Sequence, residues 1–581
     1  MARIDTELQA RLSMPEQQGE EQNESVTVIV RYLDSLQGIA SSIEGAGVVE
    51  LFGGYGIITL PLQDVNLLMR FPEIIYIEIS KPVYYNLETA RGASCVTGVQ
   101  GRELQEGASA YNGLTGKGVL VGIVDSGIAI SHPAFRLETG ESRIRFLWSQ
   151  EGRLLKTDSD TYGTVPAGYG FGREYTQSEL TEVLEQGDEE NNLLLFEGTS
   201  GHGTAVAGIA AGNGNGSVGQ RYRGIAIQSD IIVVQLGTDE TGFTDIARVM
   251  MGIDYVLRKS LELNMPIVIN LSFGTNQGAH DGNTLFEQYL ASLNGIGKNS
   301  IVIAVGNEGD SRHHAEYRLG TSELTVEFVV GENERRLFLQ IWKEYVDTID
   351  FRLISPSGTI ITLMQGEEEN YQYTESLGII SVYGEPTPFQ TRQEIFFLWR
   401  EADNIENGVW QLLAIPKRIV DGRINLWLPT REATGNRTGF LLPEVNTTLT
   451  IPSTARNIIS VGAYDAVNER YADFSGRGNT IDGRVAPDLV APGVDIITTL
   501  PENRYGVVTG TSFAAPFVSG CVALMMEWGI VQGNDVFLYG EKMKAYLWKG
   551  AKQFAGQIQV PDTKVGWGRI CLADSFPEST R

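Results

Sequence analysis

The sequence predicts an α/β fold: a doubly wound parallel sheet with helices on both faces, accompanied by two smaller units. Continuous apolar runs of strand length are typical of parallel strands buried on both faces. Four such runs lie at residues 119–124, 231–236, 267–271 and 301–305. Helical patterns separate them: apolar residues recur at helical spacing from 246 to 261, and Thr284 with Glu287 forms a capping box before another helix. Strand–helix alternation over such a length predicts a parallel sheet.

A smaller unit is predicted from residue 25 to residue 81, ahead of the parallel sheet. Its strand patterns at 26–32, 48–52, 56–60 and 74–79 are interrupted by short helical patterns at 35–44 and 63–70. This β-α-β-β-α-β order is the ferredoxin-like plan. The polar and acidic residues 1–24 are predicted to form a flexible N-terminal tail, and residues 82 to about 101 a link to the next unit.

A third unit interrupts the parallel sheet between residues 318 and 442. Short alternating strands recur there with turn signals between them, such as Pro356-Ser357-Gly358. Such a series predicts an inserted antiparallel β-sandwich of the jelly-roll kind. The α/β pattern resumes after Pro443, so the predicted α/β unit is discontinuous, with residues 96–317 before the insertion and 443–581 after it.

Composition restricts the partners of this 581-residue chain. Its 72 acidic and 45 basic residues give a net charge of −27, which offers no electrostatic route to phosphate backbones, so we expect no nucleic-acid partner. The three cysteines, Cys95, Cys521 and Cys571, are odd in number and widely spaced. They predict neither a disulfide framework nor a zinc cluster, and a reducing compartment is the default expectation.

The N-terminal residues are polar and acidic and lack an apolar segment of the kind found in signal peptides, so we expect synthesis in the cytoplasm without such a signal. No run approaches the roughly 20 apolar residues of a membrane helix, so we expect no membrane partner. No acidic cluster has convincing calcium-ligand spacing, and the sequence predicts no metal or other cofactor.

Four polar residues stand at predicted strand ends or helix starts. Asp125 and Asn307 end apolar strands, and His202 and Ser512 begin helices rich in small residues. The carboxyl ends of parallel strands are where α/β folds place ligands, and a helix N-terminus favours developing negative charge. Each residue also has a purely structural interpretation, as a turn cap, a buried histidine, an Asx-turn or a helix cap. Taken singly, those structural interpretations are the more common ones; taken jointly, the four residues favour a catalytic site.

The segments around these residues resemble those of a known enzyme family. D-S-G-I around Asp125, G-H-G-T around His202 and G-T-S-F-A-A-P around Ser512 are similar to the active-site signatures of the subtilisin-like serine proteases, or subtilases. The order Asp, His, Ser is also that of subtilisin. A-V-G-N-E-G and V-I-N-L-S-F-G resemble two further segments of the family, and the resemblance covers roughly residues 102–317 and 443–575.

The resemblance implies a serine endopeptidase. Ser512 would attack the scissile carbonyl, His202 would carry the proton, and Asp125 would orient the imidazole. The Asn307 amide and the backbone N–H of Ser512 would bind the oxyanion. Ser272, Phe273 and Gly274 would pair with an extended substrate, and Gly306 would line the pocket for its primary side chain. No role is implied for the remaining histidines, His132, His280, His313 and His314, which are expected to be structural or solvated.

The resemblance also casts residues 25–95 as a prodomain with its cleavage linker. The prodomain would bind the catalytic domain as an intramolecular chaperone and inhibitor, and cleavage would fall between Tyr85 and Val96. The inserted sandwich and the 77 positions between Asp125 and His202 make the chain similar to the clostridial spore-germination (Csp-type) subtilases. A monomeric, spore-associated protease that activates a cortex-hydrolase precursor is then expected. A general intracellular subtilisin-like protease and a catalytically silent sensor or binding protein on the same scaffold remain alternatives.

Overall fold

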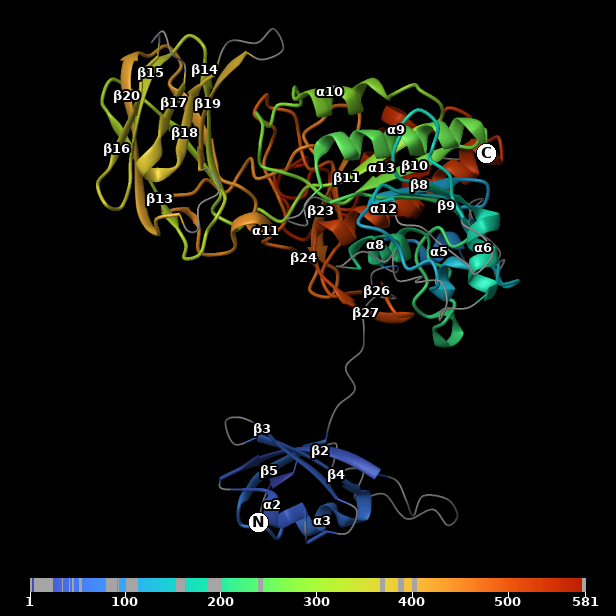
Figure 1. Cartoon of the computed structure of the whole chain (residues 1–581). Coiled ribbons are helices and arrows are strands. Elements are labelled where there is room, and N and C mark those ends of the chain that lie inside the picture. Colours follow the sequence, from blue (N-terminus) through green and yellow to red (C-terminus); the bar gives the residue numbers. More distant parts are fainter. Residues whose placement is uncertain are drawn as a thin grey trace. The chain divides into compact units, whose positions relative to one another are not determined.

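The computed structural model describes residues 3–4, 25–33, 35–40, 42–43, 46–51, 55–79, 91, 93–100, 113–152, 162–186, 196, 201–238, 244–365, 371–384, 391–399 and 405–576. The chain divides into two compact units, Met1–Tyr84 and Tyr85–Arg581 (Figure 1). The division lies earlier than the expected end of the linker at residue 95. Each unit is described by itself.

The N-terminal unit has the ferredoxin-like plan that the sequence predicts. Its strands pair antiparallel in the order β5-β2-β4-β3, and two short helices connect them. One face of the sheet is apolar, with Val28, Val30 and Ile58 fully buried against the helices. The elements are β2 Ser25–Tyr32, α2 Gln37–Ala40, β3 Gly47–Leu51, β4 Tyr55–Pro61, α3 Val65–Leu68 and β5 Ile74–Ile79.

Part of the expected N-terminal tail belongs to this sheet. Arg3–Ile4 forms β1, which pairs in parallel with β5, Arg3 opposite Tyr76 and Ile4 opposite Ile77. The rest of residues 1–24 lies outside the described residues. A flexible tail is therefore the wrong description for Arg3 and Ile4.

The second unit contains the predicted parallel sheet. Its strands run in the order β24-β23-β11-β10-β6-β9-β7-β8, with β25 beside β23, and every pair is parallel except the two outer ones, β24 with β23 and β8 with β7. The strands are β6 Leu120–Asp125, β7 Ile144–Ser149, β8 Arg173–Thr176, β9 Asp230–Gln235, β10 Ile267–Leu271, β11 Asn299–Ala304, β23 Ile459–Asp465, β24 Arg470–Tyr471 and β25 Leu489–Pro492.

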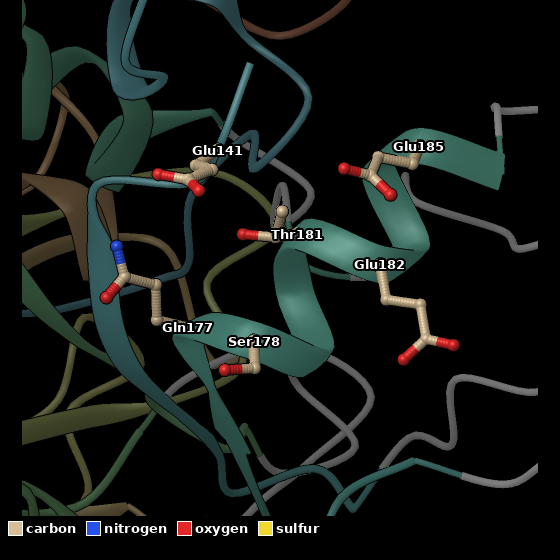
Figure 2. Close-up of a pocket in the computed structure, with 6 residues that line it drawn as sticks. All are labelled: Glu141, Gln177, Ser178, Thr181, Glu182 and Glu185. Carbon is tan, nitrogen blue, oxygen red and sulfur yellow. The ribbon is translucent and has the colours of Figure 1, made fainter. Parts of the chain in front are cut away.

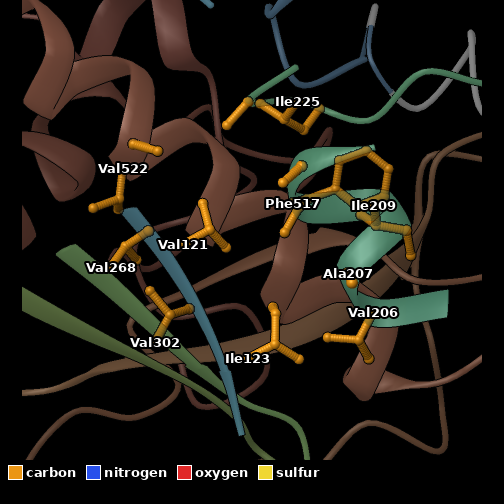
Figure 3. Packing of buried hydrophobic residues seen from close by; sticks show 14 of the residues in the cluster. Val121, Ile123, Val206, Ala207, Ile209, Ile225, Val268, Val302, Phe517 and Val522 are labelled. Carbon is orange, nitrogen blue, oxygen red and sulfur yellow. The ribbon is translucent and has the colours of Figure 1, made fainter. Parts of the chain in front are cut away.

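Helices cover both faces of this sheet because successive residues of each strand point to opposite sides. Val121 and Ile123 of β6 pack with α8 and α12 on one face (Figure 3). Leu120 and Val124 pack with α9 and α10 on the other. The described α-helices of this unit are α5 Thr97–Gln100, α6 Gln177–Gln186, α8 His202–Ala211, α9 Ile246–Glu262, α10 Leu285–Ser292, α11 Arg431–Thr434, α12 Thr511–Met526, α13 Gly540–Gly550 and α14 Leu572–Ser575. The capping box of Thr284 and Glu287 at the start of α10 is confirmed.

Strand β6 is the topological switch point of the sheet. The chain leaves β6 toward β7 and β9 on one side and returns to β10 on the other. Ligands of open α/β folds bind at the carboxyl ends of strands at such a point. Asp125 is the last residue of β6 and is therefore placed where this rule expects a site.

Helix α12 and the turn that continues it form a longer apolar helical segment than the sequence analysis expected anywhere in the chain. Among the described residues, the segment Thr511–Val531 is a helix long and apolar enough, by length and composition, to cross a membrane. The expectation that no run reaches such a length was wrong for this helix. Its most apolar window is 89% buried, since α12 packs against the sheet in the middle of the second unit.

The insertion forms two antiparallel sheets around a common apolar core. One has the order β12-β21-β14-β19-β18-β17 and the other β16-β15-β20-β13-β22. The first strand of the insertion begins at His314, slightly before the expected residue 318. Its strands are β12 His314–Arg318, β13 Leu324–Val330, β14 Leu337–Glu344, β15 Thr348–Ile354, β16 Ile360–Leu363, β17 Tyr371–Thr374, β18 Ile379–Tyr383, β19 Arg392–Trp399, β20 Gly408–Arg418, β21 Arg423–Trp427 and β22 Gly439–Phe440.

A disulfide joins the beginning of the second unit to its end. Cys95 is bonded to Cys571, with their Cα atoms 4.9 Å apart, and Cys521 is a buried free thiol. The expectation of no disulfide was wrong, because 476 residues separate the two half-cystines and only the fold brings them together. Arg91, which is 3% exposed, hydrogen-bonds the Gly224 carbonyl, so the chain from Arg91 onward is built into the second unit.

Candidate active site

Asp125 and His202 form a hydrogen-bonded pair at the switch point of the sheet. Oδ1 of Asp125 lies 2.8 Å from Nδ1 of His202, the first residue of α8. The same carboxylate oxygen accepts the backbone N–H of Ser126 at 2.7 Å. Asp125 is 3% exposed, whereas the His202 side chain is 29% exposed, so the pair combines a buried carboxylate with a ring that solvent can reach.

The glycine after His202 explains how α8 comes so close to β6. A Cβ atom on Gly203 would lie 2.1 Å from the Gly127 carbonyl oxygen and 3.1 Å from Oδ1 of Asp125. Helix α8 is also held from the other side, because Thr499 of β26 (Ile496–Leu500) donates its hydroxyl to the Thr204 carbonyl at 2.7 Å. The G-H-G-T segment therefore needs its small residues for packing as well as its histidine for chemistry.

The environment of His202 favours its protonated form. Burial alone would lower the pKa of this imidazole, but the charge of Asp125 and the hydrogen bond to it outweigh burial and hold the pKa of His202 above its ordinary value. Such a pair can accept a proton at the free ring nitrogen and stabilise the cation that results.

Ser512 lies in the first turn of α12, next to His202. The ring of the following residue, Phe513, has its centroid 5.4 Å from that of His202. The Ser512 hydroxyl donates to the Ser272 carbonyl at 3.0 Å, and the Ser272 hydroxyl donates to the Ser512 carbonyl at 2.9 Å. The Ser512 hydroxyl is thus held by the carbonyl of the residue that follows β10.

A buried chain of polar groups continues from Ser272 into the sheet. Asn270 of β10 donates to the Ser272 hydroxyl at 2.8 Å and accepts from the Ser519 hydroxyl, also at 2.8 Å. Ser519 lies two turns after Ser512 on α12. The network therefore connects α12 to the end of β10 at two points, through Ser512 and through Ser519. It fixes Ser512 relative to Ser272.

The Asn307 side chain is oriented with its amide N–H group as the available donor. Its Oδ1 accepts both the backbone N–H and the hydroxyl of Thr511, at 3.0 and 3.1 Å. Nδ2 therefore points away from Thr511 and donates to Oε1 of Glu432 at 3.4 Å. Asn307 and the N-terminus of α12 bring two kinds of N–H donor together beside Ser512.

The four expected substrate-binding residues lie on the ends of two neighbouring strands. Ser272, Phe273 and Gly274 follow β10, and Gly306 follows β11. The partly buried Phe273 side chain packs against the core on the α9 side. Ser272 is hydrogen-bonded to Ser512 and Gly306 precedes Asn307, so both strand ends reach this site, and the role of these residues in substrate binding stays a prediction.

Thr450 lies between the two strand ends, and no sequence motif pointed to it. A Cβ atom on Gly274 would lie 2.3 Å from Oγ1 of Thr450, and one on Gly306 would lie 2.4 Å from Cγ2. Thr450 is 2% exposed, and its hydroxyl has no hydrogen-bond partner among the described residues. Its side chain therefore fills the space between the two glycines. Thr450 follows the insertion, and neither it nor Glu432 belongs to any of the family signatures.

The other histidines lie in structural positions, as expected. Imidazole nitrogens of His132, His280, His313 and His314 hydrogen-bond backbone or side-chain groups within the fold. Burial lowers the pKa of His280 to about 4, and burial also lowers the pKa values of His132 and His314. All four are almost fully buried and belong to no part of the site.

An acidic hollow on α6 is unrelated to this site. Glu141, Gln177, Ser178, Thr181, Glu182 and Glu185 line it (Figure 2). None of the residues discussed above is among them. No group of three or more histidine, cysteine, aspartate or glutamate side chains in the described part of the chain has the geometry of a metal site.

Comparison with protein families agrees with this geometry. The subtilase family model matches residues 116–331 and 432–568, and the Csp protease B prodomain model matches residues 1–81. The interruption between 331 and 432 falls within the inserted sandwich.

Individual proteins show the same relationship. The solved structure of the Clostridium perfringens CspB protease is similar to this chain, with 32% identity, a TM-score of 0.74, and coverage of 84% of this chain and 96% of that one. The C5a peptidase of Streptococcus pyogenes is 25% identical over 71% of this chain and 35% of its own length. The minor extracellular protease Vpr of Bacillus subtilis is 23% identical over 72% of this chain and 47% of its own length.

The chain thus spans about a third to a half of the length of these two curated relatives. The solved structure, by contrast, is matched over nearly its whole length. On the family matches and this structural similarity together, the chain belongs to the subtilase family and is a Csp-type subtilase with its own prodomain.

Proposed function

We propose that the chain is a serine endopeptidase in which Asp125, His202 and Ser512 form the catalytic triad. The observation that carries the proposal is the 2.8 Å contact between Asp125 and His202, with the helix that carries Ser512 packed against the imidazole. Family membership supports it, because the matched ranges 116–331 and 432–568 include all three residues.

The first chemical step is attack of Ser512 Oγ on the scissile carbonyl. His202 removes the hydroxyl proton as the bond to carbon forms, and Asp125 keeps the protonated ring in place and offsets its charge. His202 then gives the proton to the leaving amine. The raised pKa of His202 supports this role, since the same contact with Asp125 stabilises the cation that forms during attack.

The negative charge on the carbonyl oxygen would be stabilised by Nδ2 of Asn307 and by the backbone N–H of Ser512. The two acceptor bonds from Thr511 hold the Asn307 amide with Nδ2 facing outward. Loss of one such donor costs about 10²–10³ in turnover.

An extended substrate would pair with the backbone of Ser272–Gly274. Its primary side chain would enter between Gly274 and Gly306, where Thr450 forms the floor. Because Thr450 fills this space, a small side chain at the cleaved bond would fit best.

The first substrate would be the chain's own linker. The prodomain match ends at residue 81, and Arg91 is buried in the second unit, so the processed bond lies before Arg91. Residues 82–90 lie outside the described part of the chain. After processing, the prodomain would remain a bound inhibitor until it is removed.

The later substrate would be the precursor of a spore cortex hydrolase, and the enzyme would act as a monomer associated with the spore. This part of the proposal is supported by the Csp-type prodomain and by the similarity to the CspB protease. A general intracellular protease would share the site but cleave many unrelated proteins.

A fluorophosphonate probe tests the central proposal, because such probes react only with an activated serine. Wild-type protein should gain one probe mass, located on the peptide that contains Ser512. His202→Ala should lose the labelling while remaining folded. If Ser512 is not labelled even after the prodomain is removed, the chain is a silent scaffold rather than an enzyme.

A further inference from the structure

A short helix within the insertion, close to its end, brings a carboxylate to the catalytic asparagine. The sandwich begins shortly after Asn307 and ends at β22, and between β21 and β22 the chain forms the short helix α11, Arg431–Thr434. Glu432 of this helix is exposed, and its Oε1 lies 3.4 Å from Nδ2 of Asn307. The insertion therefore contributes a charged side chain to the site.

Helix α11 is held in place by the residues that follow Asn307. The backbone N–H of Arg431 donates to Oε1 of Glu308 at 3.0 Å, and the Arg431 guanidinium pairs with Asp310. Glu308 is itself 2% exposed and is bound by His313 at 3.0 Å. The position of Glu432 relative to Asn307 is thus set by a buried anchor.

The carboxylate of Glu432 accepts a hydrogen bond from the Asn307 amide and is not balanced by a cation in the described part of the chain. The neighbouring cation, Arg431, is directed at Asp310, and among the described residues Glu432 takes part in no ion pair. A carboxylate this close to the amide that stabilises the oxyanion opposes the same negative charge that the amide favours. A cation from the substrate, placed beside the scissile bond, would remove that opposition.

We propose that Glu432 is a specificity-determining residue that selects substrates with a lysine or arginine flanking the scissile bond. The inference rests on the proposed protease function and goes beyond it. The cationic side chain lies outside the pocket floored by Thr450, because Glu432 is exposed whereas Thr450 is buried. Substrates without the cation are cleaved more slowly because the transition state then meets an unneutralised carboxylate.

The test compares wild type with Glu432→Gln and Glu432→Lys on a peptide library in which lysine or glutamine occupies each position around the cleaved bond. Wild type should cleave the best lysine-containing series at least about tenfold faster, in kcat/KM, than the matched glutamine series. Glu432→Gln should bring this ratio close to one, mainly by raising kcat on neutral peptides. Glu432→Lys should favour acidic peptides. Equal ratios in wild type and Glu432→Gln would overturn the proposal.

Two controls distinguish selection of cationic substrates by Glu432 from a role in which Glu432 only holds the Asn307 side chain in place. Glu323→Gln removes an equal charge from an exposed residue of the same insertion, and it should keep the wild-type ratio. If Glu432 only holds the amide, Glu432→Ala slows all peptides equally and Glu432→Gln changes nothing, which contradicts the proposal. Fluorophosphonate labelling of every variant keeps this outcome distinct from failure of the protease function itself, which would leave wild type unlabelled.

Discussion

Oδ1 of Asp125 lies 2.8 Å from Nδ1 of His202, across a sequence separation of 77 residues. One residue ends the central strand β6 and the other begins α8, and Gly203 allows the helix to approach the strand this closely. The hydrogen bond fixes which ring nitrogen carries the proton, so Nε2 is left to accept one.

Asp125→Asn tests this arrangement. An asparagine keeps the size of the side chain but stabilises the wrong tautomer of His202 and removes the charge that supports the imidazolium. We expect kcat on a peptide substrate to fall by about 10⁴, with little change in KM. Circular dichroism and the melting temperature control for folding. A loss smaller than about tenfold would remove Asp125 from the mechanism.

The pH dependence of the enzyme follows from the raised pKa of His202. Catalysis needs the neutral imidazole, so kcat/KM should rise with pH through the pKa of His202 in the free enzyme, which lies above its ordinary value. The same raised pKa has the opposite consequence for stability: the contact stabilises the fold fully below the unfolded pKa, and this contribution is lost as pH rises through the folded pKa. NMR titration of His202 in Ser512→Ala measures the pKa directly, and a value below 6.5 would be inconsistent with the account.

Thr450→Gly tests the floor of the substrate pocket. Removing this side chain empties the space between Gly274 and Gly306, so larger primary side chains should be accepted. We expect kcat/KM for peptides with leucine or phenylalanine at that position to rise by about tenfold, since two buried methyl-sized groups contribute roughly 1.6 kcal/mol. Thr450→Val keeps the volume and should keep the preference for small residues. The same size preference in Thr450→Gly and wild type would place the pocket elsewhere.

The disulfide between Cys95 and Cys571 should stabilise the second unit. A cross-link between segments so far apart restricts the unfolded chain, and loss of a native disulfide costs about 2–5 kcal/mol. Cys95→Ala should therefore melt several degrees below wild type in calorimetry. Dithiothreitol should lower the melting temperature of wild type but leave that of Cys95→Ala unchanged. An equal response of both proteins would mean that the bond contributes nothing.

The sequence predicted the parts of the site that depend on local pattern. Asp125 and Asn307 come after apolar runs, which places them at strand ends. His202 and Ser512 lie in the first turns of helices rich in small residues, which places them at helix starts. Parallel strands share one carboxyl edge, so the amino-acid sequence alone was enough to expect these groups to lie together.

The remaining parts could not be predicted because they depend on contacts between distant segments. Glu432 and Thr450 are carried to the site by the return of the chain from the sandwich, and no periodicity in their own segments reports it. The Cys95–Cys571 bond depends on the fold in the same way. The pairing of Arg3–Ile4 with β5 involves two residues, too few for a pattern to be visible.

The most direct measurement is the processing of wild type and Ser512→Ala by intact-mass analysis after expression under identical conditions. Wild type should appear as a prodomain fragment and a large fragment whose N-terminus lies before Arg91. Ser512→Ala should remain a single chain of 581 residues. Both fragments should separate without reduction, because Cys95 and Cys571 lie on the large one. Identical full-length masses for the two proteins, or identical cleavage of both, would contradict this prediction.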